Sequence, residues 1–227
     1  MKRFAPFLLL LASTPALAFP QPQREVARIV SPAWANEASR DRAGEAANVI
    51  RLLGLGAGQT VADIGAGSGY YTVRLSPVVG PRGRVVAQDV VPRYLTDLKR
   101  RVRRAGLTNV RFVLGAAGDP KLAPASVDTA LMIHMYHEIA QPYALLDRLR
   151  GSLKPGGRLA IVDLDRPSED HGMPKATLVC EVRSVGYDLV SITDLTPGYL
   201  AVFKPGRAPD PAAVKACRSE ARPAASG

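Results

Sequence analysis

A glycine-rich turn that follows a short apolar run constrains this chain more than any other feature. Residues 61–69 read Val-Ala-Asp-Ile-Gly-Ala-Gly-Ser-Gly, and the apolar run over 60–64 is typical of a buried strand. Glycines at positions 65, 67 and 69 have no Cβ atom, so the backbone can turn sharply and approach a ligand closely. Since a helix is expected from Tyr70 onward, the strand, turn and helix together predict a cofactor pocket at the turn.

Tyr70 and two acidic residues indicate which kind of ligand fits this turn. A dinucleotide fingerprint needs a third glycine where this chain has Tyr70. Asp63, just before the turn, is a poor neighbour for a pyrophosphate but suits a ligand that carries an ammonium group. Asp89 ends a second expected strand, twenty residues after Gly69, where a doubly wound fold places a ribose-binding carboxylate. The alternatives are a glycine turn without a ligand and an ordinary exposed acid at the strand end.

Strands and helices alternate along most of the chain. Strands are expected at 60–64, 84–89, 109–114, 127–133 and 158–163, and helices at 39–53, 70–77, 92–105, 142–152 and 174–185. This alternation predicts a parallel sheet that is covered by helices on both faces. A Leu-Thr-Pro-Gly turn at 195–198 predicts a closing hairpin between 188–194 and 199–203. We therefore expect an α/β fold: a doubly wound, Rossmann-like and mostly parallel seven-stranded sheet with a C-terminal antiparallel hairpin.

Four stretches in this order carry a resemblance to a known family. Residues 61–71, 86–89, 127–131 and 153–159 are similar to the motifs of class I S-adenosylmethionine-dependent methyltransferases. The resemblance runs from about residue 39 to 204 and implies one domain over that range. Within it, the stretch 134–139 resembles a branch of exported methyltransferases.

The resemblance implies S-adenosylmethionine as the cofactor and gives its contacts. The implied cofactor-binding residues are Asp63, Gly65, Gly67, Gly69, Asp89 and Asp119. The glycines would line the methionine part, Asp63 would meet the amino group and Asp89 would hold the ribose. The family often places an acid near the adenine after the third strand. Ala116 stands at that position here, so Asp119 is a shifted candidate.

The three histidines of the chain all follow strands of the expected sheet. Open α/β sheets bind ligands outside the carboxyl ends of their strands, and a histidine suits proton transfer near neutral pH. As candidate catalytic residues we select His137 first and His134 second, with Tyr136 orienting the acceptor or a ring. The alternative is that these histidines cap a helix or bond a backbone carbonyl.

We assign no metal ligands from the sequence. An alternative is that His134, His137, His171 and Asp163 converge on one ion. Imidazole and carboxylate groups together suit zinc or a similar metal.

The two ends of the chain lie outside the expected domain. Residues 1–18 combine a basic start, a short apolar core and an Ala-Leu-Ala site, which predicts a signal peptide cleaved before Phe19. We thus expect an exported protein, periplasmic or secreted, with no membrane span after cleavage. Residues 19–38 are expected to form an N-terminal arm, and 205–227 a disordered Pro/Ala-rich tail.

The charge of the chain bears on whether it binds nucleic acid, and its cysteine content bears on whether it holds a disulfide. The formal net charge is +10, and much of the excess lies on the helix expected at 92–105. Such a run attracts nucleic acid, but no aromatic residue is interleaved in its dense part at 99–104, so a solvated helix face is favoured. Cys180 and Cys217 are the only cysteines, and the apolar surroundings of Cys180 favour a buried thiol, with a disulfide as the alternative.

These observations lead to two functional hypotheses. The first is an exported S-adenosylmethionine-dependent methyltransferase that acts on a small molecule or a cell-envelope component. The second is an exported non-catalytic binding or scaffold module that keeps the same fold. Tyr70 and the closing hairpin disfavour a nicotinamide-dependent oxidoreductase, and the sequence leaves the oligomeric state open.

Overall fold

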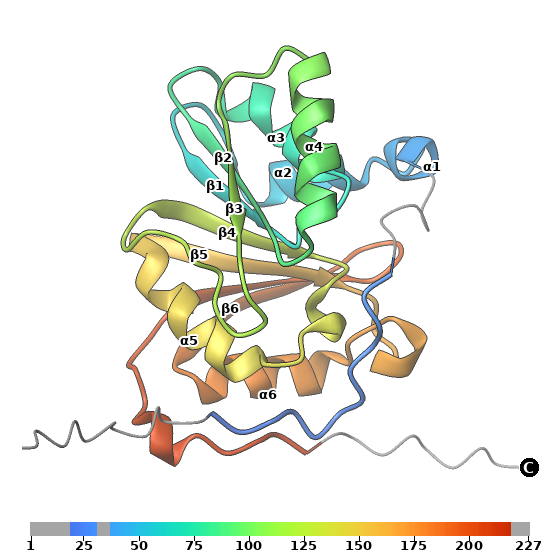
Figure 1. Cartoon of the computed structure of the whole chain (residues 1–227). Coiled ribbons are helices and arrows are strands. Elements are labelled where there is room, and N and C mark those ends of the chain that lie inside the picture. Colours follow the sequence, from blue (N-terminus) through green and yellow to red (C-terminus); the bar gives the residue numbers. More distant parts are fainter. Residues whose placement is uncertain (1–18, 31–36, 219–227) are drawn as a thin grey trace, which may run out of the picture.

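The computed structural model describes residues 19–30 and 37–218 (Figure 1). The signal peptide predicted at 1–18 lies outside these residues. Within them, seven strands form one sheet with the order β3-β2-β1-β4-β5-β7-β6. No helix in the described ranges is both long and apolar enough to cross a membrane.

The sheet has the predicted mixture of parallel and antiparallel strands. Its strands are β1 (Thr60–Ile64), β2 (Arg84–Asp89), β3 (Val110–Leu114), β4 (Val127–Ile133), β5 (Leu153–Asp163), β6 (Tyr187–Asp194) and β7 (Tyr199–Pro205). The first five strands pair in parallel, whereas β7 runs antiparallel to both β5 and β6. The predicted fold class is therefore confirmed. Strand β5 begins earlier than expected because Leu153 pairs with Val127 before the register shifts.

The helices also follow the predicted order. They are α1 (Glu37–Arg42), α2 (Glu45–Leu52), α3 (Tyr70–Val79), α4 (Pro92–Arg104), α5 (Pro142–Ser152) and α6 (Lys175–Ser184), with short 3-10 helices η1 (Tyr136–Glu138), η2 (Ser168–Asp170) and η3 (Pro211–Ala213). The single helix expected over 39–53 is in fact two helices. Gly44 separates them because it adopts a left-handed conformation with φ of 66°.

Helices cover both faces of the sheet (Figure 1). Ala62 and Ile64 of β1 pack in a core cluster with α5 and α6, whereas Val61 packs with α2 and α3 on the other face. Helix α4 packs on that second face too, through Leu98 against Ala87. This alternation follows from the two-residue period of a strand, and it leaves the carboxyl ends of the parallel strands free to carry a site.

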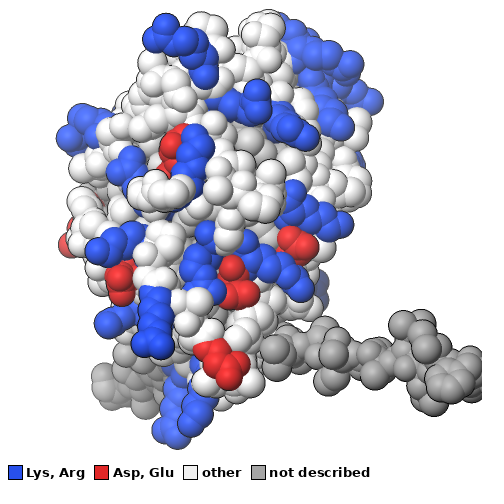
Figure 2. Space-filling view, turned by 90° about the vertical axis from the view of Figure 1, so that its left-hand side faces the viewer, with Lys and Arg blue, Asp and Glu red and all other residues white. Residues whose placement is uncertain are grey.

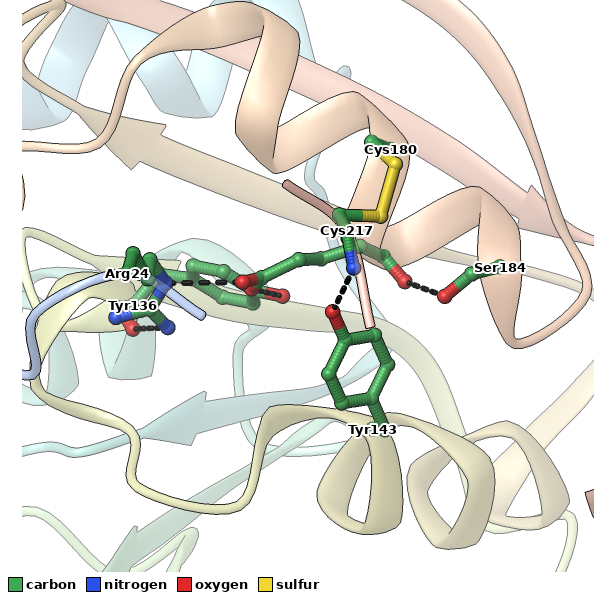
Figure 3. Close-up of a disulfide and its surroundings, with 7 residues drawn as sticks. Arg24, Tyr136, Tyr143, Cys180, Ser184 and Cys217 are labelled. Carbon is green, nitrogen blue, oxygen red and sulfur yellow. Dashed lines mark hydrogen bonds and ion pairs between the residues drawn. A yellow bond between two sulfur atoms is a disulfide. The ribbon is translucent and has the colours of Figure 1, made fainter. Parts of the chain in front are cut away.

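A buried arginine helps to hold the N-terminal arm, residues 19–30, against the domain (Figures 1 and 3). Arg24 is 6% exposed, and its Nε donates a hydrogen bond of 3.1 Å to Oε1 of the fully buried Glu181 in α6. Its Nη1 also donates to the carbonyl oxygen of His137 at 3.1 Å. The arm thereby joins α6 to η1 and reaches the edge of the sheet that carries the strand ends.

A disulfide attaches the C-terminal segment to the same side of the domain. Cys180 of α6 is bonded to Cys217, whose backbone N–H donates to the Tyr143 hydroxyl at 2.8 Å (Figure 3). The prediction of a buried free thiol at Cys180 is therefore wrong, and the alternative, a disulfide, is what the structure has. Val214 and Cys217 are buried, so the expected disorder does not describe residues 205–218. Residues 219–227 lie outside the described part.

Basic residues predominate over acidic ones on the face shown in Figure 2. Helix α4 also carries several basic residues, but they do not all extend into solvent. Arg101 forms an ion pair of 2.6 Å with Glu37 and donates to the Ser68 carbonyl oxygen at 3.1 Å. One arginine of the basic run thus secures α1 next to the glycine turn.

Candidate functional site

A cavity of about 400 Å³ lies at the carboxyl ends of β1, β2 and β4. Its volume falls within the range of roughly 300–1,000 Å³ that is common for small-molecule sites. The lining comes from the glycine turn, the end of β2, the segment after β4, helices α1 and α2, and the N-terminal arm. These segments meet because neighbouring parallel strands end at one edge of the sheet.

The glycine turn forms one wall of this cavity. Gly65 and Gly67 line it, whereas Gly69 lies behind it as the N-cap of α3. A Cβ atom on Gly65, where φ is 67°, would lie 2.8 Å from Met135 Cε. A Cβ atom on Gly69, where φ is 83°, would lie 2.1 Å from Leu98 Cδ1. A side chain at either position would be strained by the positive φ and would displace Met135 or Leu98.

Asp63 lies at the base of the wall, at the end of β1. Its side chain lines the cavity and is 3% exposed, and the Thr72 hydroxyl donates to its Oδ2 at 2.6 Å. Burial raises the pKa of Asp63 to about 6, against the opposing effect of the Thr72 hydrogen bond. This carboxyl group is therefore poised to accept a cationic partner, which would offset the burial of its charge.

Asp89 ends β2 and fixes the geometry of the turn. Its Oδ2 accepts from the Gly67 N–H and its Oδ1 from the Val91 N–H, both at 2.8 Å. Burial raises its pKa even though these two backbone donors act to lower it. A carboxylate has about four acceptor positions, so Asp89, which lines the cavity, can still accept from a ribose hydroxyl.

Gln88 is a cavity residue that the sequence analysis missed. Its Oε1 accepts from the Gly65 N–H at 3.3 Å, and its buried Nε2 has no hydrogen-bond partner within the described part of the chain. An unpaired buried donor is costly unless a ligand satisfies it. The signal that could have revealed Gln88 is its position: it directly precedes the acid that ends β2.

The predicted adenine contact is not among the cavity residues. Asp119 accepts from the Lys121 N–H at 2.8 Å and bridges to Ala116. Its neighbour Ala117 lines the cavity instead. A contact from Asp119 to the cofactor thus stays a prediction, and the structure brings its turn, rather than its carboxylate, to the cavity.

Of the three candidate catalytic residues, His134 is the one that lines the cavity. It has a φ of 52° directly after β4, and its N–H donates to the Val162 carbonyl oxygen at 2.8 Å. Its Nε2 lies 3.6 Å from Oε1 of Glu45 in α2. Burial acts to raise the pKa of Glu45, but hydrogen bonds from His134 and Arg40 hold that pKa at about 2. His134 therefore faces a carboxylate that is ionised near neutral pH.

Tyr136 and His137 point into the protein interior. The Tyr136 hydroxyl donates to Glu181 Oε2 at 2.9 Å, and Tyr136 is fully buried. His137 is 1% exposed, and its Nδ1 lies 3.0 Å from both carboxylate oxygens of Asp163. Neither lines the cavity. Their catalytic roles remain predictions, and the geometry favours His134 over His137.

Helices α1 and α3 add a cluster of side chains that the sequence motifs did not predict. Tyr70 lines the cavity with its ring between the guanidinium groups of Arg40 and Arg74, whose Cζ atoms lie 3.8 and 3.7 Å from the ring centroid. The Tyr70 hydroxyl donates to Asp41 at 2.9 Å. These residues come from two helices that are far apart in the sequence, α1 and α3, so their proximity is a product of the tertiary fold.

Comparison with known proteins agrees with this geometry. Residues 61–157 match the family described as "Methyltransferase domain". A solved S-adenosylmethionine-dependent methyltransferase from Aquifex aeolicus superposes with a TM-score of 0.66 at 22% identity, covering 74% of this chain and 98% of that one. Residues 61–157 thus match a methyltransferase domain, and the chain has the fold of S-adenosylmethionine-dependent methyltransferases. A fibrillarin from Aeropyrum pernix, solved with natively bound S-adenosylmethionine, has the same fold, with a TM-score of 0.54 at 21% identity over 71% of this chain and 75% of that one.

Curated relatives of this chain match it over only part of their own length. An arsenite methyltransferase from Halobacterium salinarum is 31% identical over 107 residues, 47% of this chain and 27% of that protein. A ubiquinone/menaquinone biosynthesis C-methyltransferase from Klebsiella pneumoniae is 30% identical over 119 residues, 52% of this chain and 47% of that protein. The chain thus spans about half or less of the length of these relatives. The cofactor of the family is S-adenosylmethionine, and the residues around the turn fit it.

The buried Asp63 predicts how stability depends on pH. Because the pKa of Asp63 in the folded state, about 6, exceeds its ordinary value of 3.8, the folded state binds an extra proton between these pH values. The free energy of unfolding should therefore fall as pH rises through this window, and Asp63→Asn should abolish that fall. Between pH 4 and 7, the free energy of unfolding of the wild type should fall by roughly 1–3 kcal/mol relative to that of Asp63→Asn, as measured by urea unfolding. A difference between wild type and Asp63→Asn that is constant with pH would contradict this origin.

Proposed function

We propose that the protein transfers a methyl group from S-adenosylmethionine to an acceptor bound in the same cavity. One observation carries this proposal: a single cavity is lined both by the turn residues that fit the cofactor and by the His134–Glu45 pair. When bound, the cofactor supplies an electrophilic methyl group on a sulfonium centre. The remaining tasks, alignment and exclusion of water, fall to the chain.

The glycine turn and its two acids would hold the cofactor. The Asp63 carboxylate would meet the amino group of the methionine part, and Asp89 would accept from the ribose hydroxyls. The unpaired Nε2 of Gln88 is a further donor beside them. The backbone at Gly65 and Gly67 allows close approach because no side chain stands between the turn and the cavity.

His134 is the residue that we propose for proton transfer. An acceptor hydroxyl or amine gives up a proton when its new bond to carbon forms, and a neutral imidazole can take that proton. The imidazolium would then be stabilised by the Glu45 carboxylate, 3.6 Å from its Nε2. Arg40 and the Tyr71 hydroxyl, both bonded to Glu45, would hold this carboxylate in place.

The acceptor side of the cavity is largely apolar. Ile29 and Val30 of the arm, Tyr94 of α4 and Ile139 line it together with the polar groups described above. We infer an acceptor that is a small molecule or an envelope component with an apolar face, rather than nucleic acid. The relatives are named for acceptors as different as arsenite and a quinone precursor, so their acceptors are not carried over.

Cofactor binding is the first test of this function. Calorimetric titration should show that the protein binds S-adenosylmethionine and its demethylated product, S-adenosylhomocysteine. Asp89→Ala should weaken both by about 10- to 100-fold, because each hydrogen bond to a carboxylate contributes about 1.5–3 kcal/mol. The control is Asp97→Ala, which removes a surface carboxylate from α4, the helix that follows Asp89. Failure of wild type to bind either compound would refute the cofactor pocket, and an unchanged affinity of Asp89→Ala would refute the ribose contact.

Proton transfer by His134 is tested with labelled cofactor. Incorporation of the labelled methyl group into an envelope extract should fall by about 10²- to 10⁴-fold in His134→Gln, while calorimetry shows that cofactor affinity is largely kept. Transfer at the wild-type rate in His134→Gln would contradict the proposed base. Cofactor binding without transfer by wild type to any extract would instead support the non-catalytic binding module.

We further propose that the protein is exported to the periplasm or secreted. The pattern of residues 1–18 supports this proposal, as does the disulfide between Cys180 and Cys217, which suits an oxidising compartment. Cell fractionation should find a protein that begins at Phe19 outside the cytoplasm. An uncleaved chain confined to the cytoplasm would contradict export.

A further inference from the structure

A cluster of potential metal ligands lies beside the cavity, between η1 and the loop that follows β5. His137, Glu138 and His171 each offer one ligand atom, and these atoms all lie within 4.8 Å of one another. The two imidazole rings are 5.6 Å apart between centroids and nearly perpendicular, at 79°. We propose that these three residues bind a divalent transition-metal ion of the zinc type.

The hydrogen bonding of His137 prepares one of its nitrogens for a ligand. Its Nδ1 lies 3.0 Å from both oxygens of the fully buried Asp163, and an ionised carboxylate only accepts hydrogen bonds. The proton of a neutral ring is therefore on Nδ1, and Nε2 presents its lone pair. A carboxylate that orients a histidine in this way is the usual partner of a metal-bound imidazole.

Two buried nitrogens of the cluster have no hydrogen-bond partner among the described residues. They are Nε2 of His137, a side chain that is 99% buried, and Nδ1 of His171. Buried polar atoms without partners are rare and costly. A metal ion between the two rings would bind both nitrogens at once. The two rings do not satisfy each other, because neither nitrogen has a hydrogen-bond partner among the described residues.

Charge and donor type favour a zinc-like ion. When ionised, Glu138 and Asp163 place two negative charges beside the two imidazoles, which matches a divalent cation. Two nitrogens and one carboxylate oxygen form a donor set that zinc accepts. Ligand atoms around tetrahedral zinc lie about 3.3 Å apart, so the cluster would need to contract by about 1.5 Å at most.

The position of Glu138 gives the proposed site a connection to the rest of the molecule. Glu138 lines the cavity, and its Oε1 accepts from the Val30 N–H of the arm at 3.2 Å. An ion bound here would tie the arm, η1 and the loop after β5 together at the cavity wall. With three protein ligands, a fourth position would remain for water or an acceptor atom, as in zinc sites that are catalytic.

This site differs from the metal alternative considered from the sequence. His134 belongs to the cavity and faces Glu45, so it does not join the cluster. Asp163 orients His137 instead of binding the ion, and Glu138 takes its place as the carboxylate ligand. The inference does not depend on methyl transfer, because the cluster stands on its own geometry.

Metal titration of the full chain tests the proposal directly. After removal of metals with a chelator, the protein should bind one Zn²⁺ per chain by calorimetry, and Co²⁺ should give the visible absorption of a low-symmetry site. Zn²⁺ should raise the midpoint of thermal unfolding, as any ligand of the folded state does. His171→Gln should abolish the absorption and the stabilisation, and Asp163→Asn should weaken binding by about 10- to 100-fold.

A neighbouring acid in the same loop supplies the matched control. Glu169→Gln removes a carboxylate close to His171 in sequence but outside the cluster, and it should bind Zn²⁺ like wild type. Circular dichroism would verify that His171→Gln is folded, which its partly exposed position favours. Absence of stoichiometric Zn²⁺ or Co²⁺ binding, or full binding by folded His171→Gln, would overturn the site. In that case a buried water would be the partner of the two nitrogens.

Discussion

The hydrogen bonds of Asp89 are the constraint on which the rest of the site depends. One carboxylate accepts from the Gly67 N–H of the turn and from the Val91 N–H at the start of α4. It thereby joins the loop after β1 to the end of β2 and to the next helix. Since Leu98 of α4 packs where a Cβ atom of Gly69 would lie, the same helix also sets the shape of the turn from behind.

The side of the cavity opposite this turn is formed by segments that lie far from the turn in the sequence. The arm brings Ile29 and Val30 to the cavity, and its anchor is the buried pair of Arg24 and Glu181. Burying two charges is costly, and such a pair is retained when its hydrogen bonds are complete. Here Tyr136 and backbone carbonyls complete them. The core of the domain thus determines where the acceptor side of the cavity lies.

Much of the fold and the cofactor side was predictable because it is encoded locally. The apolar strand ending at Ile64 and the glycines that follow it determine the turn by backbone conformation alone, so they were found from sequence spacing. The preference for His137 over His134 was not supported by the geometry. A tight 3-10 turn follows β4. Because of this turn, His134 lies at the cavity whereas His137 lies in the protein interior. Periodicity of a strand or helix does not describe such a segment.

The sequence by itself determined the order of strands and helices, the glycine turn, and the two acids that frame it, because these depend on local conformation and the regular geometry of a parallel sheet. Only the tertiary structure decided which histidine meets the cavity, that Gln88 presents an unpaired donor, and that Cys180 reaches Cys217. Those contacts join segments separated by tens of residues. Their geometry results from packing of the whole core, which no local pattern contains.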